Sequence, residues 1–445
     1  MIKYYSTNKK SNKVSFKEAL FLGQAIDKGL FMPESIPKLN IKKITTFKSL
    51  TYPEIAFEVL YPFLKDEIPD SVLKKITQEA YDFDVPIEKI EPGKFILRLD
   101  RGPSASFKDF AARLMARIMN YLLEKENKKL NILVATSGDT GGAVADAFYF
   151  QGNINVTILF PKDEVTSTQR KQMTTIGKNI KAIAVNGKFD DCQNLVKQAL
   201  TDQNLRHLNL SSANSINICR LLPQAVYYFY SYSRIVEKPG EKIVFCVPSG
   251  NFGNLMGGLI AKNMGLPVKR FVVCVNENDE FLSFLKTSIY KPIIPSIGCI
   301  SNAMNVGHPS NLARIIELYG GNMDEKGKIC KMPDLKKIKK ELFAVSITDE
   351  ATKKTIIDVY QKNKTLLEPH GAVAYAGMNS YISENKELSP IVVIETAQPS
   401  KFKEELIKLG ISRDLLKSMD YLDRKKEVDE ITINNDYGEF MKILN

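Results

Sequence analysis

The chain has 445 residues, of which 44% are hydrophobic and 25% are charged; this is the composition of a globular protein with two or three domains. The six cysteines show no Cys-x-x-Cys spacing, which argues against a disulfide framework or a zinc cluster. No stretch approaches the ~20 apolar residues of a membrane span, and no secretory signal core begins the chain. The net charge of +11 comes from dispersed lysines, so we expect a cytoplasmic protein without nucleic acid or membrane partners.

Three regions follow one another along the chain. Residues 1–95 are expected to be mostly helical, because apolar residues recur at helical spacing in residues 15–26 and 52–64. Residues 96–235 are predicted to form a first α/β domain, partly shared with the next one. Residues 236–445 are predicted to form a second, larger α/β domain.

Short apolar runs followed by helical segments recur from about residue 94 onward. This alternation of strands and helices predicts parallel-rich sheets and an α/β fold. The predicted strands are residues 94–99, 131–136, 155–160, 180–185, 242–249, 269–276 and 391–396.

One charged residue falls on the apolar face of a predicted helix that begins near residue 107. At 100° per residue, Lys108 lies in line with Met115 and Met119. Burial and the helix N-terminus both lower the pKa of a lysine, and a neutral lysine is a nucleophile toward an aldehyde. The alternative is a lysine whose stem covers apolar surface while its ammonium group reaches water.

The opposite arc of the same helix is polar. It comprises Asp109, Arg113, Arg117, Asn120 and Glu124. Because Asp109 and Arg113 are four residues apart, we expect an ion pair between them on the outer face of the helix.

Two glycine-rich turns, residues 137–142 (SGDTGG) and 249–254 (SGNFGN), connect a strand to a helix. Exposed backbone N–H groups and the helix dipole attract an anion at such a turn, although a tight turn alone would also need the glycines. Neither turn has the dinucleotide or Walker pattern, so a nicotinamide-dependent dehydrogenase is disfavoured. A third stretch, residues 210–220 (LSSANSINICR), offers amides, hydroxyls and Arg220, which either grips a phosphate or carboxylate or lies on the surface of a capping loop.

An aldehyde-binding lysine, an anion-binding glycine turn and an α/β scaffold together describe the chemistry of pyridoxal 5'-phosphate (PLP). The segments that carry a family resemblance are GPSASFKDFAAR, ATSGDTGGAVADAF, SSANSINICR, VPSGNFGNLMGG, NVGHPSNLAR and ETAQPSKF. In this order, with KYYSTN and DKGLFMPESIP near the start, they resemble the threonine synthase family. The resemblance implies a fold-type II PLP enzyme, an α/β protein similar to the tryptophan synthase β chain.

For the cofactor, the resemblance implies three kinds of contact. Lys108 would form a Schiff base with PLP and act as the catalytic residue. Thr396 would hydrogen-bond to the pyridine nitrogen, and a hydroxyl there, unlike a carboxylate, should leave that nitrogen unprotonated. The cofactor phosphate would be cradled by Gly250, Asn251, Phe252, Gly253 and Asn254.

For the substrate, the resemblance implies an anionic small molecule, O-phospho-L-homoserine, and no metal. Ser137, Asp139 and Thr140 would line the substrate side, while Asn214 and Arg220 would grip its carboxylate or phosphate. The implied reaction gives L-threonine and phosphate by γ-elimination and β-addition of water, in a monomer or a homodimer. A related phospholyase that gives a 2-oxo acid, and a non-catalytic protein of the same fold, stay open as alternatives.

Three positions depart from the family pattern. Ser104 stands where Thr is common, Gln398 where His is common, and Gly371 where Thr follows the histidine. Ser104 keeps a hydroxyl, whereas Gln398 cannot transfer a proton and Gly371 has lost a hydroxyl. None of these departures touches Lys108 or the phosphate cradle.

Overall fold

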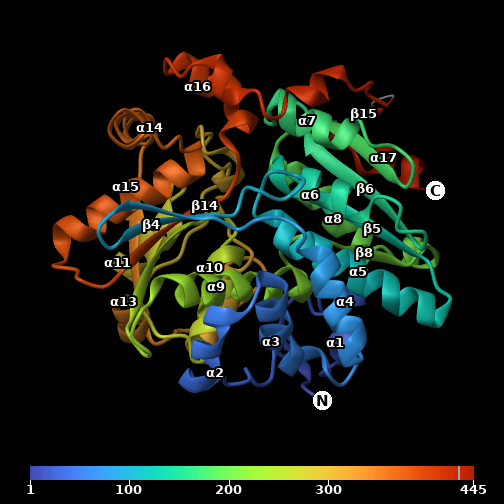
Figure 1. The fold of residues 1–445 in the computed structure, drawn as a ribbon. Coiled ribbons are helices and arrows are strands. Elements are labelled where there is room, and N and C mark those ends of the chain that lie inside the picture. The colour runs from blue at the N-terminus through green and yellow to red at the C-terminus, as the bar shows by residue number, and fades with distance from the viewer. Residues whose placement is uncertain (429–430, 445) are drawn as a thin grey trace.

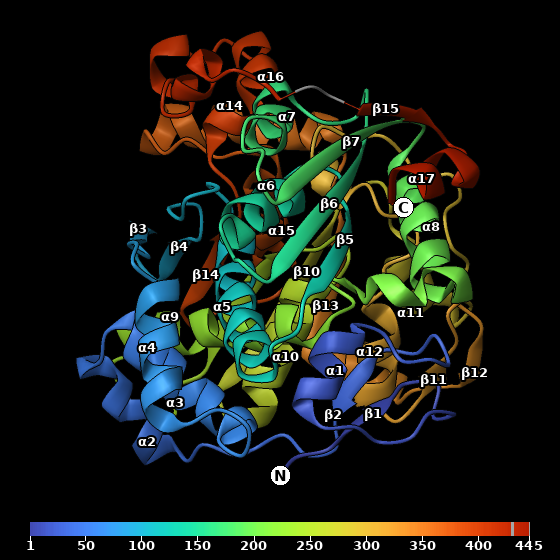
Figure 2. The ribbon, with the colours of Figure 1, turned by 90° about the vertical axis from the view of Figure 1, so that its right-hand side faces the viewer.

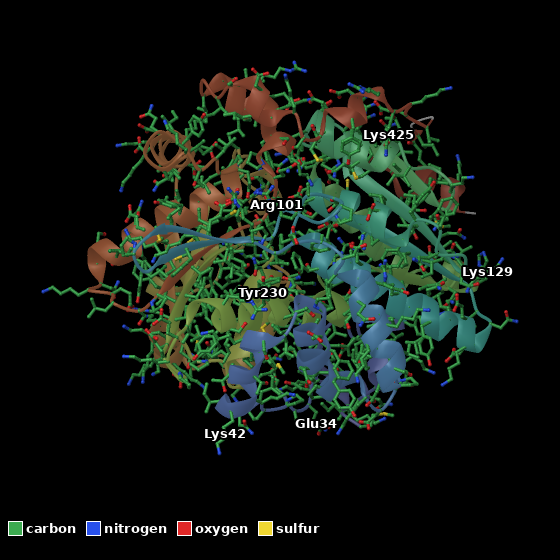
Figure 3. The ribbon with its side chains drawn as sticks, in the orientation of Figure 1. Glu34, Lys42, Arg101, Lys129, Tyr230 and Lys425 are labelled. Carbon is green, nitrogen blue, oxygen red and sulfur yellow. The ribbon has the colours of Figure 1, made fainter. Side chains whose placement is uncertain are left out.

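The computed structural model describes residues 1–428 and 431–444 and contains two parallel-rich sheets that lie side by side above a group of N-terminal helices (Figure 1). The C-terminal segment leaves the larger sheet, passes α16 (Lys403–Lys408) and ends beside the smaller sheet. Among the described residues, no helix is long and apolar enough to cross a membrane. Charged side chains such as Lys42, Lys129 and Lys425 project from the periphery (Figure 3).

The larger sheet has the strand order β13-β10-β9-β14-β4-β3, with β3 antiparallel to β4 and parallel pairing elsewhere. Alternate side chains of its central strands face opposite ways: Val244 and Cys246 pack beneath α15, whereas Phe245 and Val247 pack toward α9 and α10. The elements are β3 (Ile87–Glu91), β4 (Lys94–Arg98), β9 (Ile243–Pro248), β10 (Val268–Val275), β13 (Leu342–Ser346), β14 (Ile391–Glu395), α9 (Val226–Ile235), α10 (Gly253–Met264), α11 (Glu280–Thr287), α12 (Leu312–Leu318), α13 (Leu335–Glu341), α14 (Asp349–Asn363) and α15 (Pro369–Glu384), with β11 (Asn322–Met323) and β12 (Ile329–Lys331) forming a small hairpin.

The smaller sheet has the order β15-β7-β6-β5-β8 and is parallel throughout its described strands. Helices α5, α6 and α7 cover one face, and α8 and α17 cover the other (Figure 2). The elements are β5 (Leu130–Ala135), β6 (Ile154–Pro161), β7 (Ile180–Asn186), β8 (Leu210–Ser212), β15 (Ile431–Asn434), α5 (Lys108–Glu126), α6 (Asp139–Phe148), α7 (Ser167–Thr174), α8 (Phe189–Thr201) and α17 (Tyr437–Leu444).

The N-terminal helices pack against α5 through aromatic side chains. Tyr52 lies 5.3 Å from Phe110 of α5 and 5.2 Å from Tyr230 of α9, measured between ring centroids. These contacts bind the N-terminal region to both α/β layers. Its elements are β1 (Tyr4–Ser6), β2 (Phe31–Pro33), α1 (Phe16–Leu22), α2 (Ile41–Thr46), α3 (Tyr52–Leu64) and α4 (Asp70–Ala80).

The α/β fold and all seven predicted strands are confirmed, with ends that differ by at most one residue. The remaining strands, β1, β2, β3, β8, β11, β12, β13 and β15, were not predicted. The sheets do not divide at residue 235: β4 joins the larger sheet, whereas β15, from the far end of the chain, joins the smaller one. Pairing partners far apart in sequence produce this exchange, which local patterns do not encode.

The predicted surface ion pair between Asp109 and Arg113 is wrong. Both side chains are buried, because α4 covers the polar arc of α5. Arg113 donates hydrogen bonds to the Ala80 carbonyl oxygen at 2.8 Å and to Asp82 at 2.7 Å. Asp109 accepts a hydrogen bond from the backbone N–H of Ser104 at 2.9 Å, so it fastens the loop before α5 to the helix.

Burial raises the pKa of Asp109 to about 7. The native state therefore holds a proton that the unfolded chain releases near pH 4, and stability should fall between about pH 4 and pH 7. Asp109→Asn should remove this component, so its stability relative to the wild type should rise by a few kcal/mol across that range. Urea unfolding at several pH values measures it, with the exposed Asp84→Asn as a control. Parallel curves for Asp109→Asn and wild type would contradict the assignment.

Candidate active site

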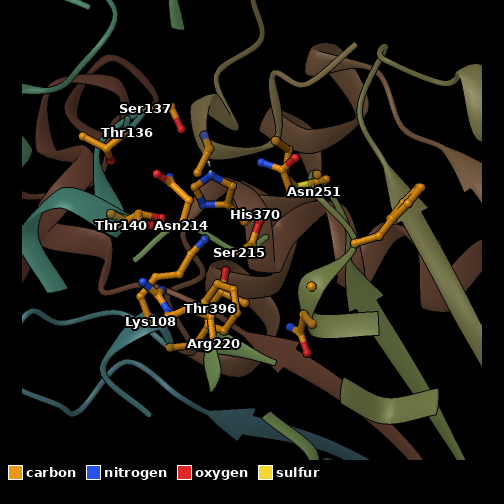
Figure 4. A pocket seen from close by; sticks show the side chains of 18 of the residues that line it. Lys108, Thr136, Ser137, Thr140, Asn214, Ser215, Arg220, Asn251, His370 and Thr396 are labelled. Carbon is orange, nitrogen blue, oxygen red and sulfur yellow. Dashed lines mark hydrogen bonds between the residues drawn. The ribbon is translucent and has the colours of Figure 1, made fainter. Parts of the chain in front are cut away.

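A cleft lies between the two sheets, at the carboxyl ends of their parallel strands (Figure 4). All the residues that the sequence singled out line it together: Lys108, Ser137, Asp139, Thr140, Asn214, Arg220, Gly250, Asn251, Phe252, Gly253, Asn254 and Thr396. The structure brings them into one site, and the role of each remains a prediction.

Lys108 is placed by backbone pairing between the loop before α5 and the end of β14. The N–H of Phe107 donates to the Thr396 carbonyl oxygen at 2.8 Å, and the N–H of Gln398 donates to that of Ala105 at 3.0 Å. The chain then enters α5 with Lys108 as its first residue. The ammonium nitrogen lies 4.5 Å from the centroid of the Phe107 ring, and the side chain extends into the cleft (Figure 4).

The surroundings of Lys108 favour its neutral form. Desolvation in the cleft is the main cause that lowers its pKa to about 8; Arg220 and Lys401 contribute to this lowering, and Asp139 opposes it. Asp139 lies 2.7 Å from the Lys401 ammonium and accepts a hydrogen bond from Gln169 at 3.0 Å. Although burial opposes its ionisation, chiefly Lys401 keeps the pKa of Asp139 below its usual value. The cleft thus holds an amine that titrates near neutral pH beside a fixed carboxylate.

The opposite wall is the N-terminus of α10, where the first-turn N–H groups have no acceptor within the helix. Phe252 adopts the left-handed backbone conformation, with φ of 58°, which turns the preceding residues around the cleft. A Cβ atom at Gly250 would lie 2.9 Å from the carbonyl oxygen of Ala303, so a side chain there would crowd the cradle. Among the described residues, the buried Nδ2 of Asn254 has no hydrogen-bond partner. These donors fit a bound anion.

Arg220 and Asn214 differ in their freedom to bind a ligand. Arg220 is buried, its Nη1 donates to the Ala213 carbonyl oxygen at 2.6 Å, and within residues 1–428 and 431–444 its buried Nε has no partner. Burial lowers its pKa to about 10, which still leaves it charged near neutral pH. The Asn214 amide, in contrast, pairs with both the N–H and the carbonyl oxygen of Ala135, so it joins its loop to β5.

The sequence analysis did not identify Glu368 and His370, which are buried at the start of α15, as candidate site residues. His370 lines the cleft, and Glu368 caps the helix by accepting the N–H groups of His370 and Gly371. The dipeptide Glu-Pro ahead of an apolar run is the signal that could have located this helix start. The buried Lys401 gave no signal, because only the folded chain places it against Asp139.

The three departures from the family pattern now have places. Gln398 accepts a hydrogen bond from Ser418 at 2.6 Å outside the cleft lining, and the Ser104 carbonyl oxygen accepts one from Lys401 at 3.0 Å. Gly371 lies in the first turn of α15, where a Cβ atom would come within 1.5 Å of Oε2 of Glu395. A side chain at residue 371 would therefore require the Glu395 carboxyl group to shift.

Lys108, the anion-binding N-terminus of α10 and Thr396 line one cleft between two parallel-rich sheets. This arrangement defines a PLP-dependent enzyme of fold type II. Comparison with known families supports this class: residues 87–397 match the model for pyridoxal-phosphate-dependent enzymes, and residues 3–81 match that for the threonine synthase N terminus. The chain belongs to the threonine synthase family.

Individual relatives extend over nearly the whole chain. A protein of Buchnera aphidicola from Acyrthosiphon pisum, named threonine synthase, is 39% identical over 416 residues, which cover 92% of each chain. The crystal structure of PLP-bound threonine synthase from Brucella melitensis has a TM-score of 0.90 and 32% identity, and covers 100% of this chain and 99% of that one. The Escherichia coli threonine synthase structure has a TM-score of 0.90, 35% identity and 99% coverage of both chains.

The residues of the cleft fit PLP on chemical grounds. An amine of lowered pKa suits the aldehyde, and the α10 N-terminus with the unpaired Nδ2 of Asn254 suits the phosphate. The buried Thr396 hydroxyl lies in the same cleft as Lys108, where it can meet the ring nitrogen.

The lowered pKa of Lys108 predicts how fast the apoprotein captures added PLP. The rate should rise with pH around a midpoint near 8, rather than the ordinary 10.5, and Lys108→Ala should capture none. Lys401→Met removes a repelling cation and unpairs Asp139, so the midpoint should move upward by roughly one pH unit. Stopped-flow absorbance measures the rate.

Lys403→Met is the matched control, because Lys403 lies near Lys401 in the chain but pairs with Asp420 and Asp423 away from the cleft. An unchanged midpoint in Lys401→Met, or a wild-type midpoint near 10.5, would contradict the electrostatic account.

The contact between Gly371 and Glu395 predicts a coupled effect on stability. Gly371→Ala should lower the free energy of unfolding by about 1–3 kcal/mol or more, because the new methyl group overlaps the carboxylate. In a Glu395→Ala background the same change should cost less. Urea unfolding of the two single variants and the double variant measures the coupling, and purely additive costs would refute it.

Proposed function

We propose that this chain converts O-phospho-L-homoserine and water into L-threonine and phosphate with PLP, as a carbon–oxygen lyase acting on a phosphate ester. The observation that carries the proposal is the cleft itself, in which Lys108 faces the α10 N-terminus. Its support from relatives is broad, since proteins named threonine synthase match the chain at 37–40% identity.

The cofactor would be held at both ends. The first-turn N–H groups of α10 and Nδ2 of Asn254 bind its phosphate, and Oγ1 of Thr396 meets its pyridine nitrogen. Bound PLP supplies an electron sink that stabilises negative charge at the substrate Cα.

Lys108 is the residue that moves protons. With a pKa of about 8, part of its population is a free amine near neutral pH. Nζ can therefore take the proton from Cα, take one from Cβ as phosphate leaves Cγ, deliver one to Cγ, and return one to Cα after water adds at Cβ. Asp139 stabilises the ammonium form between these transfers, because its carboxylate attracts it. One amine can therefore serve both the γ-elimination of phosphate and the β-addition of water.

Arg220 binds the anionic end of the substrate. Within the described residues, the buried Nε of Arg220 has no hydrogen-bond partner. A charged donor in a site that excludes water binds a carboxylate or phosphate strongly. Ser137 and Thr140 orient the substrate from the α6 turn. Asn214 holds the adjoining loop through its two bonds to Ala135.

We also propose a cytoplasmic enzyme that acts as a monomer or a homodimer. All six cysteines lie in described residues and are free thiols, which suits a reducing compartment.

Product analysis tests the proposal. Holoenzyme incubated with O-phospho-L-homoserine should release threonine and phosphate in equal amounts, and Lys108→Ala should lose at least about 10²–10⁴-fold in rate, since its proton transfers are gone. Lys125→Ala, at an exposed lysine of the same helix, is the control and should retain wild-type rates. Release of 2-oxobutyrate and phosphate without threonine would identify a phospholyase, and no turnover by PLP-loaded protein would identify a non-catalytic relative.

A further inference from the structure

The buried carboxylate of Glu368 lies behind Thr396 and accepts hydrogen bonds from several groups. Its Oε1 accepts the Gly371 N–H at 2.9 Å and the Thr396 hydroxyl at 3.1 Å. Its Oε2 accepts the backbone N–H of His370 at 2.7 Å and faces the ring Nδ1 of His370 at 2.5 Å. An ionised carboxylate has about four acceptor positions, and these four contacts occupy them.

The hydrogen bonds of the His370 imidazole show which of its two ring nitrogens carries a hydrogen. Its Nε2 accepts the backbone N–H of Ala303 at 3.1 Å, so Nε2 carries no hydrogen. Nδ1 then carries one and donates it to Glu368. Every group that touches the Glu368 carboxylate in these contacts is thus a donor, which leaves no place for a proton on Glu368 itself.

A second buried carboxyl group, Glu395, contacts the backbone of Glu368. Its Oε1 accepts the Glu368 backbone N–H at 2.9 Å and lies 3.5 Å from Nη1 of Arg98. Its Oε2 is buried and, among the residues described, has no partner. Burial, and then the nearby Glu368 carboxylate, raise the pKa of Glu395 well above its usual value, which favours the neutral form of Glu395.

The hydroxyl of Thr396 has a single hydrogen, and Glu368 receives it. A hydrogen bond to a carboxylate is roughly twice as strong as one to a neutral acceptor such as an unprotonated pyridine. Toward the cleft, Oγ1 therefore presents only lone pairs. A ring nitrogen that meets Thr396 must supply the hydrogen of that bond itself.

We propose that Glu368 is a positioning residue that fixes the Thr396 hydroxyl as a hydrogen-bond acceptor and so holds the cofactor's pyridine nitrogen in its protonated form. This reverses the expectation from Thr396 alone, in which a hydroxyl leaves the nitrogen unprotonated. The proposal rests on the contact of Thr396 with that nitrogen, which is part of the proposed function.

A protonated ring is a stronger electron sink than a neutral one. The proposed reaction removes protons at both Cα and Cβ, so it draws on that sink more heavily than a simple elimination does. Glu368 gives the site this property without placing a carboxylate against the ring nitrogen.

The ring nitrogen can be observed directly by ¹⁵N NMR of the holoenzyme loaded with PLP that is ¹⁵N-labelled at that atom. The wild type should show the chemical shift of a protonated ring. In Glu368→Gln the amide can donate to Oγ1, which frees the Thr396 hydrogen to face the ring, so the signal should move to the unprotonated position. Thr396→Val, which removes the acceptor, should move it the same way and serves if Glu368→Gln folds poorly.

Glu395→Gln is the matched control, because it changes the neighbouring buried carboxyl group and leaves the hydrogen bond between Thr396 and Glu368 in place, so the signal should stay at the protonated position. Borohydride fixation confirms that each variant holds the cofactor. An unprotonated signal in the wild type, or a protonated one in both Glu368→Gln and Thr396→Val, would overturn the proposal. Threonine formation by the wild type is measured separately, so this proposal can fail while the proposed function stands.

Discussion

Backbone pairing between the loop before α5 and the end of β14 is the constraint on which the site depends. Hydrogen bonds from Leu99, Phe107 and Gln398 join the two segments, which come from distant parts of the chain. As a result, the amine of Lys108 and the hydroxyl of Thr396 enter one cleft from adjacent backbones. The α6 turn follows β5 of the smaller sheet and the α10 turn follows β9 of the larger sheet, and residues of both turns line the cleft between the sheets.

The charged side chains at this cleft carry an excess of positive charge. Lys108 and Arg220 line it and Lys401 lies directly behind it, while Asp139 is the carboxylate that compensates them. A site with surplus positive potential stabilises anionic groups that enter it. Desolvation is the main cause of the lowered pKa of Lys108, and the charges of Arg220 and Lys401 add to it.

Local sequence patterns predicted the central strands and helices correctly. They did not predict which neighbouring elements pack over each of them. Helical phase placed Lys108 on the buried side of α5, and alternation located the central strands. Phase also assigned Asp109 and Arg113 to an outer face, which failed because α4 covers that arc and supplies Arg113 with carbonyl partners. Periodicity shows which residues share a face, whereas the neighbour that covers it comes from elsewhere in the chain.

By itself the sequence predicted the central strands and their helices, the two glycine turns and a lysine on the buried side of α5, because these follow from periodicity and backbone chemistry within short segments. Only the tertiary structure decided how protons are distributed behind the site. Glu368, His370 and Thr396 exchange hydrogen bonds at the junction of α15 and β14, with Ala303 fixing the imidazole from a third segment. A hydrogen-bond direction depends on every partner at once, and those partners meet only in the folded chain.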